Sequence, residues 1–285
     1  METLFVDKDG NRVSDLDIEN ALVATGAHKS DTLFIHSDIM FGSLVQGIKR
    51  NELLSVLFDQ IKKLNVRNII VPTFTYSFPN GEDYDVLNSR TSMGVFNEYV
   101  RKLDGRYRTD DPLLSVSVPE SLQDTFGRVS YHSLGEGSAL DIIHQMGNVS
   151  FLFFGAEMSE CFTYVHYVEK ILDVPYRFDM SFEGNVIYPD GTVKRRNQTI
   201  HTQCRGAVLP PKYEHFESEM EDRGYLKKKR IGDRYIACLS EKDAYREIRD
   251  HILNDISYFL SVPFNEADMV KEYTYSTDNG RITHC

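Results

Sequence analysis

The sequence predicts an α/β fold in three layers, α/β/α, with a central mostly parallel or mixed sheet and helices on both of its faces. Two observations carry this prediction. Short apolar runs with the length of buried strands alternate along the chain with longer stretches of helical periodicity. The chain of 285 residues, 41% of them hydrophobic and 26% charged, also has the size and composition of a globular protein with a well-buried core.

The first half of the chain supplies most of the predicted sheet. A small hairpin is expected over residues 4–13, and Ser14 with Asp17 then forms a capping box for a helix that ends at Gly26. Further strands are predicted at apolar runs bounded by turn residues: 32–35, 68–72, 114–118 and 149–155. Further helices are predicted where apolar residues recur every three or four positions: 51–65, 92–103, 138–146 and 161–172. The polar and aromatic stretch 73–91 is expected to be a functional loop.

After Tyr176 the pattern changes to a smaller hairpin-and-helix C-terminal part. Residues 180–209 alternate as hairpins do, around a turn at 189–191. The segments expected after them are a helix at 213–223, strands at 229–231 and 235–239, and a long helix at 240–260. We expect one domain over residues 1–285, made of a core at about 15–178, a C-terminal subdomain at about 179–262 and a peripheral tail at 263–285.

Charge and cysteine usage exclude several classes of protein. A net charge of −11 opposes binding to a phosphate backbone, so no nucleic-acid partner is expected. The acidic N-terminus and the lack of an apolar run of 18 residues argue against a signal peptide and against membrane insertion. The cysteines show neither metal-ligand spacing nor a disulfide framework, so no metal is expected; they are Cys161, Cys204, Cys238 and Cys285. These features favour a cytoplasmic protein.

The strongest candidate for catalysis is the predicted helix that follows the apolar run at 151–156. Thr163 and Glu169 each lie about 60° from His166 around such a helix, so a hydroxyl, an imidazole and a carboxylate share one face. A histidine that accepts a proton needs a partner that fixes its tautomer, and the carboxylate supplies one. The alternative at this point is an interior histidine on an ordinary amphipathic helix.

Several loops at predicted strand ends or helix starts suit a phosphate-bearing cofactor. His36 and Ser37 follow a strand and lead into a loop with two glycines. Ser138 begins a helix after Gly-Glu-Gly, and Arg108 is a fixed cation suited to phosphate or carboxylate. Each of these signals is weak by itself, because an ordinary loop explains it as well.

The loop that begins after Pro72 offers candidate substrate contacts. Thr73, Thr75 and Tyr76 could hold a ligand through hydroxyls and a ring face, because ligands of open α/β sheets bind outside the carboxyl ends of the strands. Glu82 and Asp85 could recognise an ammonium group. The alternative is a solvated acidic loop.

Read together and in order, these segments resemble the aminoglycoside 3-N-acetyltransferase family. The resemblance covers about residues 15–178. It rests on His36-Ser37, Val71-Pro72-Thr73, Met93-Gly94 with Glu98 and Arg101, Arg108 with Pro112 and Ser115-Val116, Gly135 to Ser138, Phe154-Gly155, and Thr163, His166 and Glu169.

The resemblance implies transfer of an acetyl group from acetyl-CoA to an amine, without a metal. It implies that His166 is the general base, that Glu169 orients it and that Thr163 supports the site. It also places a set of residues along the coenzyme: His36, Ser37, Thr73, Arg108 and Ser138. An amine is protonated at neutral pH, so a nearby base and an acidic patch would both help such a reaction.

The substrate is where this sequence departs from the family. Asp38 and Asp111 replace residues that are common in the family, and the loop at 74–91 does not resemble that of the resistance enzymes. We therefore expect a small-molecule amine and prefer an amino sugar, nucleotide-linked and destined for a surface polysaccharide. Its diphosphate would face a set of basic residues: Arg177, Lys194, Arg195 and Arg196. The alternative substrate is an aminoglycoside antibiotic.

Two different mechanisms or roles stay open at this point. Cys161 could be a nucleophile that forms an acyl-enzyme, although it lies about 140° from His166 if one helix contains both. A non-catalytic carbohydrate-binding protein is the other alternative. The sequence also leaves a homodimer open.

Overall fold

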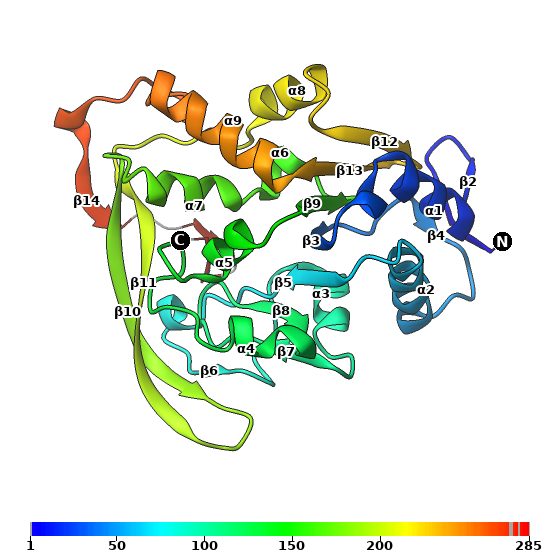
Figure 1. Ribbon diagram of the computed structural model, residues 1–285, viewed down its shortest axis with the longest axis horizontal. Coiled ribbons are helices and arrows are strands. Elements are labelled where there is room, and N and C mark those ends of the chain that lie inside the picture. The colour runs from blue at the N-terminus through cyan, green and yellow to red at the C-terminus, as the bar shows by residue number, and fades with distance from the viewer. Residues whose placement is uncertain (1, 274–275, 279, 285) are drawn as a thin grey trace.

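The computed structural model describes residues 2–273, 276–278 and 280–284 (Figure 1). Its centre is a seven-stranded sheet with the strand order β12-β13-β9-β3-β5-β8-β7. In this order the strands are Lys227–Ile231, Arg234–Ser240, Val149–Phe154, Thr32–Ser37, Asn68–Pro72, Val116–Pro119 and Arg106–Arg108. The three central strands β9, β3 and β5 are parallel, and every outer pairing is antiparallel. The predicted mixed three-layer α/β fold is therefore confirmed.

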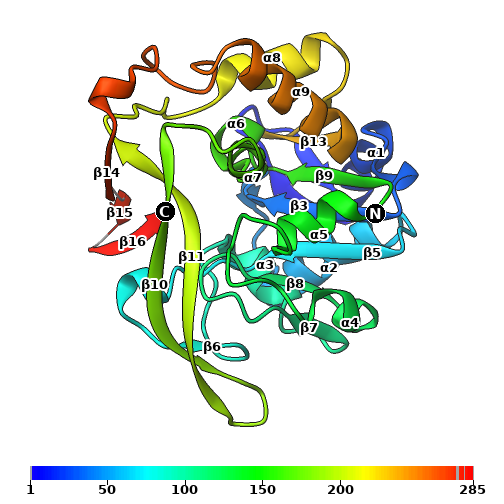
Figure 2. The same cartoon turned by 60° about the vertical axis from the view of Figure 1, so that its left-hand side comes forward.

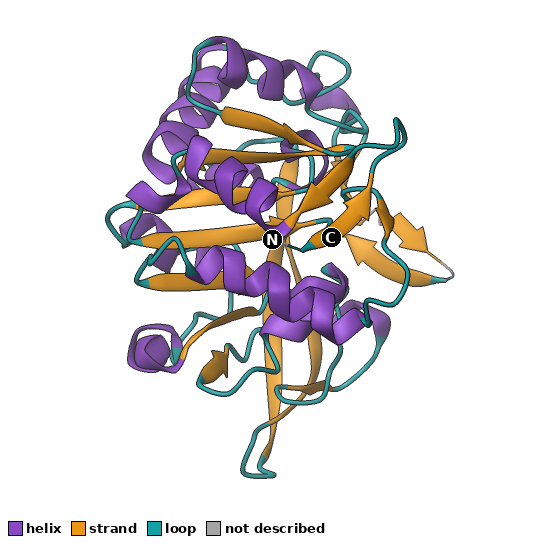
Figure 3. Cartoon of the chain, turned by 90° about the vertical axis from the view of Figure 1, so that its right-hand side faces the viewer, coloured by secondary structure: helices purple, strands orange, loops and turns teal. Residues whose placement is uncertain are grey.

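Helices cover both faces of this sheet (Figure 3). Successive strand residues point to opposite faces, so Leu33 and Ile35 of β3 pack in one apolar cluster and Phe34 packs in the other. The first cluster includes residues of α1 (Asp15–Ala24), α2 (Arg50–Lys62) and α3 (Gly94–Val100). The second includes residues of α4 (Gln123–Phe126), α5 (Ala139–Gln145), α6 (Met158–Cys161), α7 (Tyr164–Ile171), α8 (Glu214–Asp222) and α9 (Glu241–Asn254).

A long hairpin forms a second sheet beside the central one (Figure 2). Its strands are β10 (Arg177–Ile187) and β11 (Val193–Arg205), and the sheet order is β14-β11-β10-β6 with β14 at Val270–Tyr273 and β6 at Tyr84–Asp85. The smaller elements are β1 (Thr3–Val6), β2 (Arg12–Ser14), β4 (Ser43–Leu44), β15 (Ser276–Asp278), β16 (Arg281–His284) and four short 3₁₀ turns at Ala27–Lys29, Phe78–Asn80, Glu120–Leu122 and Glu266–Asp268. Among the described residues, no helix combines the length and the apolar character that a bilayer crossing requires.

Two predicted helices differ most from the structure, and the bounds of the others differ by at most three residues at either end. The helix expected at 161–172 is two helices, since Phe162 with ψ 72° leaves the helical region and separates α6 from α7. The helix expected at 240–260 begins at its predicted Ser240 cap, but Asp255 is extended and ends it at Asn254.

The strand expected at 114–118 starts two residues later than predicted. The backbone N–H groups of Leu113 and Leu114 donate to the Asp111 carboxylate at 2.8 and 3.0 Å, and these bonds hold the segment in a turn. The edge strand β7 was not predicted.

Candidate functional site

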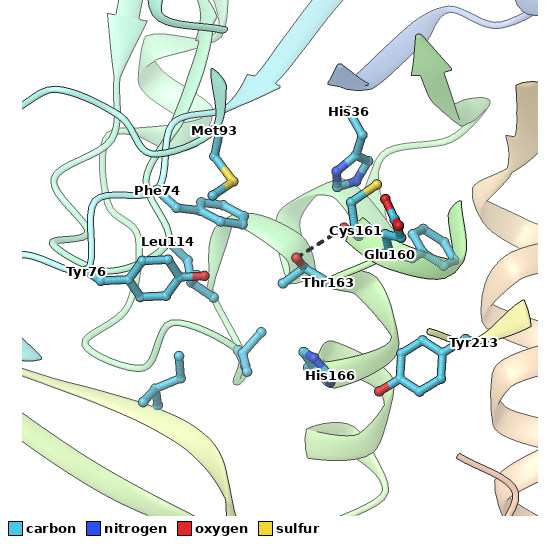
Figure 4. A pocket seen from close by; sticks show the side chains of 13 residues that line it. His36, Phe74, Tyr76, Met93, Leu114, Glu160, Cys161, Thr163, His166 and Tyr213 are labelled. Carbon is cyan, nitrogen blue, oxygen red and sulfur yellow. Dashed lines mark hydrogen bonds between the residues drawn. The ribbon is translucent and has the colours of Figure 1, made fainter. Parts of the chain in front are cut away.

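The pocket of interest lies outside the carboxyl ends of the three parallel strands. The chain leaves the central strand β3 toward β5 on one side and later returns to β9 on the other, which is the arrangement that opens a ligand crevice in α/β sheets. The cavity has a volume of about 170 Å³ (Figure 4). Its lining residues are His36, Phe74, Tyr76, Met93, Leu114, Leu134, Glu160, Cys161, Phe162, Thr163, His166, Ile200 and Tyr213.

A close backbone approach places α7 at this pocket. Gly155, directly after β9, has φ +80°, and a Cβ there would lie 1.8 Å from the backbone oxygen of Asp38. The loops after β9 and β3 therefore meet at a point that only glycine fits. Thr163 occupies the cap position of α7, where its Oγ1 donates to the Cys161 carbonyl at 3.5 Å, and His166 follows one turn later.

His166 and Glu169 form a hydrogen-bonded pair at the base of the pocket. His166 Nδ1 lies 2.8 Å from Glu169 Oε2, and the carboxylate side chain is fully buried whereas 24% of the histidine side chain is exposed. Tyr176 donates its hydroxyl to Glu169 Oε1 at 2.9 Å, and Arg177 Nε lies 2.7 Å from Oε2. The carboxylate is thus inside the protein, and the imidazole reaches from it into the cavity.

The charge of Glu169 decides the tautomer of His166. Burial alone would raise the pKa of Glu169, but the cation of Arg177 and the hydrogen bonds from His166 and Tyr176 outweigh burial and lower that pKa to about 2. Arg177 Nη2 also lies 2.8 Å from His166 Nδ1, so this nitrogen has both a donor and an acceptor beside it. Because the acceptor is an ionised carboxylate, we assign the proton to Nδ1, which leaves the lone pair on Nε2 to accept a proton.

His36 is the second imidazole of the pocket. It is 5% exposed at the end of β3 and stacks on Phe153 with ring centroids 5.4 Å apart and planes 10° apart. Burial lowers the pKa of His36 to about 3, so its ring is neutral.

Cys161 lies in α6, separate from the helix of His166, so the 140° separation on one helix does not apply. Its Sγ donates to the Glu157 carbonyl at 3.1 Å, and burial raises the pKa of its thiol well above the usual range. A protonated thiol is a poor nucleophile, so this geometry does not favour an acyl-enzyme.

The residues predicted along the coenzyme do not all reach the cavity. Arg108 is buried and donates to the carbonyls of Thr73 (2.7 Å) and Ser89 (2.6 Å), and Thr73 is fully buried beside it. Ser138 caps α5 by accepting from the Asp141 N–H at 3.2 Å. Ser37 donates to Asn97 Oδ1 at 2.9 Å. Of the predicted site residues, the cavity wall contains His36, Tyr76, Thr163 and His166.

The predicted substrate contacts other than Tyr76 also have internal partners. Thr75 donates to the Pro112 carbonyl at 2.8 Å. Asp85 accepts from the backbone N–H groups of Leu87 and Asn88 at 2.9 and 2.8 Å, as the acid of a turn. Glu82 forms a bidentate pair with Arg281.

The basic residues that were expected to face a diphosphate lie apart from one another. Arg177 belongs to the His166 cluster and not to a nucleotide site. Arg196 Nη1 lies 2.8 Å from Asp110 Oδ1, and Arg195 Nη2 lies 2.8 Å from Glu183 Oε2. Lys194 lies over the ring of Tyr188. Sequence reasoning missed the role of Arg177, because nothing in the spacing from α7 to the first residue of β10 indicates that the two meet.

The site can therefore deprotonate a nucleophile next to a neutral, buried imidazole. The cavity wall is mostly apolar, and its one acid, Glu160, pairs with Lys212 at 2.6 Å. The described residues contain no group of histidine, cysteine, aspartate or glutamate side chains suited to a metal ion. A buried carboxylate behind a histidine base is typical of acyl-transfer chemistry.

Comparisons with known proteins define the class and then the family. The class is that of an N-acyltransferase, as the sequence predicted. The family model described as aminoglycoside 3-N-acetyltransferase matches residues 55–252, and the chain belongs to this family. Among curated proteins, none matches this sequence.

Solved structures share this fold at low sequence identity. Aminoglycoside acetyltransferase AAC(3)-Xa has a TM-score of 0.70 at 17% identity, covering 87% of this chain and 94% of that one. AAC-IIIb, solved as a binary complex with CoASH, has a TM-score of 0.66 at 16% identity, covering 88% and 99%. AAC-VIa bound to sisomicin has a TM-score of 0.68 at 15% identity, covering 84% and 97%.

These findings confirm the predicted family and enzyme class, and the expected co-substrate agrees with the relative that binds CoASH. On the substrate, they favour the alternative, an aminoglycoside, over the amino sugar that we preferred from the sequence. They give no support to a role in polysaccharide synthesis.

Proposed function

We propose that the protein transfers the acetyl group of acetyl-CoA to an amine of an aminoglycoside, with His166 as general base. The observation that carries this proposal is the His166–Glu169 pair at the base of a cavity beside the parallel strand ends. Family membership supports the reaction, and relatives solved with CoASH and with sisomicin support the two substrates. The reaction is a direct transfer in this proposal.

In this scheme His166 carries the proton while the acetyl group passes from the sulfur of the thioester to the amine nitrogen. The amine nitrogen attacks the thioester carbon, the C=O electron pair moves onto oxygen, and the amine proton passes to His166 Nε2. Glu169 stabilises the imidazolium through Nδ1. The C–S bond then breaks, and the thiolate takes the proton from His166 as coenzyme A leaves. Thr163 supports the start of α7, and Glu160 and Tyr76 also line the cavity.

The coenzyme would cross the carboxyl ends of the strands past the loops that follow β3 and β5. His36 would contact it directly from the cavity wall. Ser37, Thr73 and Arg108 would shape these loops, and Ser138 the start of α5, through the internal hydrogen bonds described above. We place the reaction in the cytoplasm, in keeping with the free thiols of Cys161, Cys204 and Cys238. A homodimer stays a prediction for a sedimentation measurement.

A thiol-release assay with acetyl-CoA tests the function. The panel contains sisomicin, gentamicin and kanamycin, together with nucleotide-linked amino sugars. We expect turnover with aminoglycosides, and we expect His166→Ala to lower kcat by about 10²-fold or more, the usual worth of a general base. The exposed His28→Ala serves as the matched control.

Three outcomes would contradict the proposal. Turnover with nucleotide-linked amino sugars and not with aminoglycosides would show that the acceptor is an amino sugar. Near-normal turnover of His166→Ala would remove this residue from the mechanism. Calorimetry without coenzyme A binding by the wild type would end the transferase assignment.

A further inference from the structure

The second imidazole of the pocket, that of His36, has no role in the proton transfer proposed for His166. His36 lines the same cavity, yet its Nε2 is buried and has no hydrogen-bond partner among the described residues. A buried polar atom without a partner destabilises a fold, so its presence at this position needs an explanation. In a pocket that binds a substrate, the missing partner can be the substrate itself.

The surroundings of His36 hold one ring orientation and one charge state. Phe153 stacks against the ring, Phe34 lies at 5.2 Å between centroids, and Phe162 meets it edge-on at 6.3 Å. These apolar neighbours disfavour the imidazolium, and the lowered pKa of His36 agrees with a neutral ring. A neutral imidazole carries one N–H donor, fixed before the substrate arrives.

Acyl transfer requires a donor of this kind. Negative charge develops on the carbonyl oxygen as the amine adds, and a preorganised donor near that oxygen lowers the barrier. Thr163 and Cys161 on the same wall donate to backbone carbonyls, so these two donors are already engaged. Figure 4 shows the His36 ring reaching from the end of β3 toward Cys161 and Thr163, with His166 beyond them on α7.

We propose that His36 is a catalytic residue that donates its N–H to the thioester carbonyl oxygen and stabilises the oxyanion of the tetrahedral intermediate. This inference rests on the proposed function and deepens it. His36 exchanges no proton: the amine proton goes to His166, the C=O electron pair resides on the oxygen that His36 contacts, and the pair returns as the C–S bond breaks. His166 thus removes the proton of the amine that attacks the thioester carbon, and His36 stabilises the oxygen bonded to the same carbon.

The decisive variant is His36→Phe, which keeps an aromatic ring against Phe153 and removes the donor. We expect kcat for acetyl transfer to fall by about 10²-fold, the usual effect of losing one oxyanion donor. The calorimetric Kd for coenzyme A, which has no acetyl carbonyl, should change less than about threefold. His36→Gln restores an N–H donor and should recover part of kcat, and His28→Phe at an exposed site should match the wild type.

A spectroscopic measurement separates this role from a structural one. The infrared C=O stretch of acetyl-CoA, ¹³C-labelled at the carbonyl and bound without acceptor, should lie lower in the wild type than in His36→Phe. If the Phe variant does not fold, His36→Leu supplies the comparison without a donor.

Wild-type kcat and an unshifted C=O stretch in a folded His36 variant would overturn the inference. A loss of coenzyme A binding equal to the loss of kcat would also overturn it, because His36 would then shape the pocket only. If the wild type binds no coenzyme A, the proposed function itself is wrong. That outcome is therefore distinguishable from a failure of the inference about His36.

Discussion

At the scale of single residues, Glu169 has the most demanding position. A fully buried carboxylate is tolerated because Arg177, Tyr176 and His166 together satisfy both of its oxygens. The same three contacts keep the residue ionised. The stability of this region and the tautomer of His166 therefore depend on the charge of Glu169.

This dependence predicts how stability changes with pH. The pKa of Glu169 is about 2 in the folded protein and 4.5 in the reference state, so folding favours the ionised form. The stabilisation is fully present above about pH 4.5 and is lost as the pH falls from there toward 2. We expect urea unfolding free energies of the wild type to drop by on the order of 3 kcal/mol more over this window than those of Glu169→Gln/Arg177→Gln.

The control for this measurement is Glu82→Gln, which removes an ion pair at the surface. Glu82 and Arg281 are 45% and 56% exposed, and such a pair contributes little in water. Parallel pH curves for the wild type and the double variant would show that Glu169 is not the group responsible.

At the scale of elements, the contact between the ends of β3 and β9 positions both imidazoles. His36 is on β3, and His166 is on the helix that follows β9. Gly155 allows the two loops to touch, and its left-handed φ and the 1.8 Å approach to Asp38 exclude any side chain there.

Gly155→Ala should therefore separate the strand ends and misplace α7. We expect a loss of several kcal/mol in unfolding free energy, because strain and backbone displacement add, together with a fall in kcat/KM. Gly147→Ala is the matched control, since a Cβ at Gly147 meets nothing within 4 Å. Equal stability of the two variants, measured by chemical denaturation, would contradict this account of the strand ends.

The elements also show what the sequence could and could not predict. The caps at Ser14 and Ser240 involve neighbours three residues away, so local pattern was sufficient for them. The break at Phe162, whose ring packs on Phe151 and Phe153, and the edge strand β7, which pairs with β8, involve tertiary contacts that override local preference.

The site residues also fall into those that local pattern predicts and those that it does not. His166 and Glu169 are one helical turn apart, so the sequence alone predicts their contact. Arg177 and Tyr213 reach the same region from other elements, and no periodicity connects them with α7. Arg108 looked suited to a phosphate, but the carbonyls it binds belong to a loop folded over it.

At the scale of the whole molecule, the net charge of −11 should assist capture of a polycationic acceptor. We expect kcat/KM for gentamicin to fall as ionic strength rises from 0.01 to 0.3 M, because salt screens long-range attraction. The kcat/KM of an acceptor with a single amine and no other charged group should fall much less with ionic strength. Steady-state kinetics with both acceptors checks this, and identical salt responses would mean that the global charge plays no part.

The order of strands in the central sheet also has a consequence for synthesis of the chain. β9 pairs with β3 on one edge, but its other edge is covered by β13, whose first residue is Arg234. Until that residue has left the ribosome, the strand that leads to His166 presents an open edge capable of pairing with another chain. The helices α6 and α7 and the whole β10–β11 hairpin are synthesised during this interval, so the nascent protein carries His166 well before its sheet is closed.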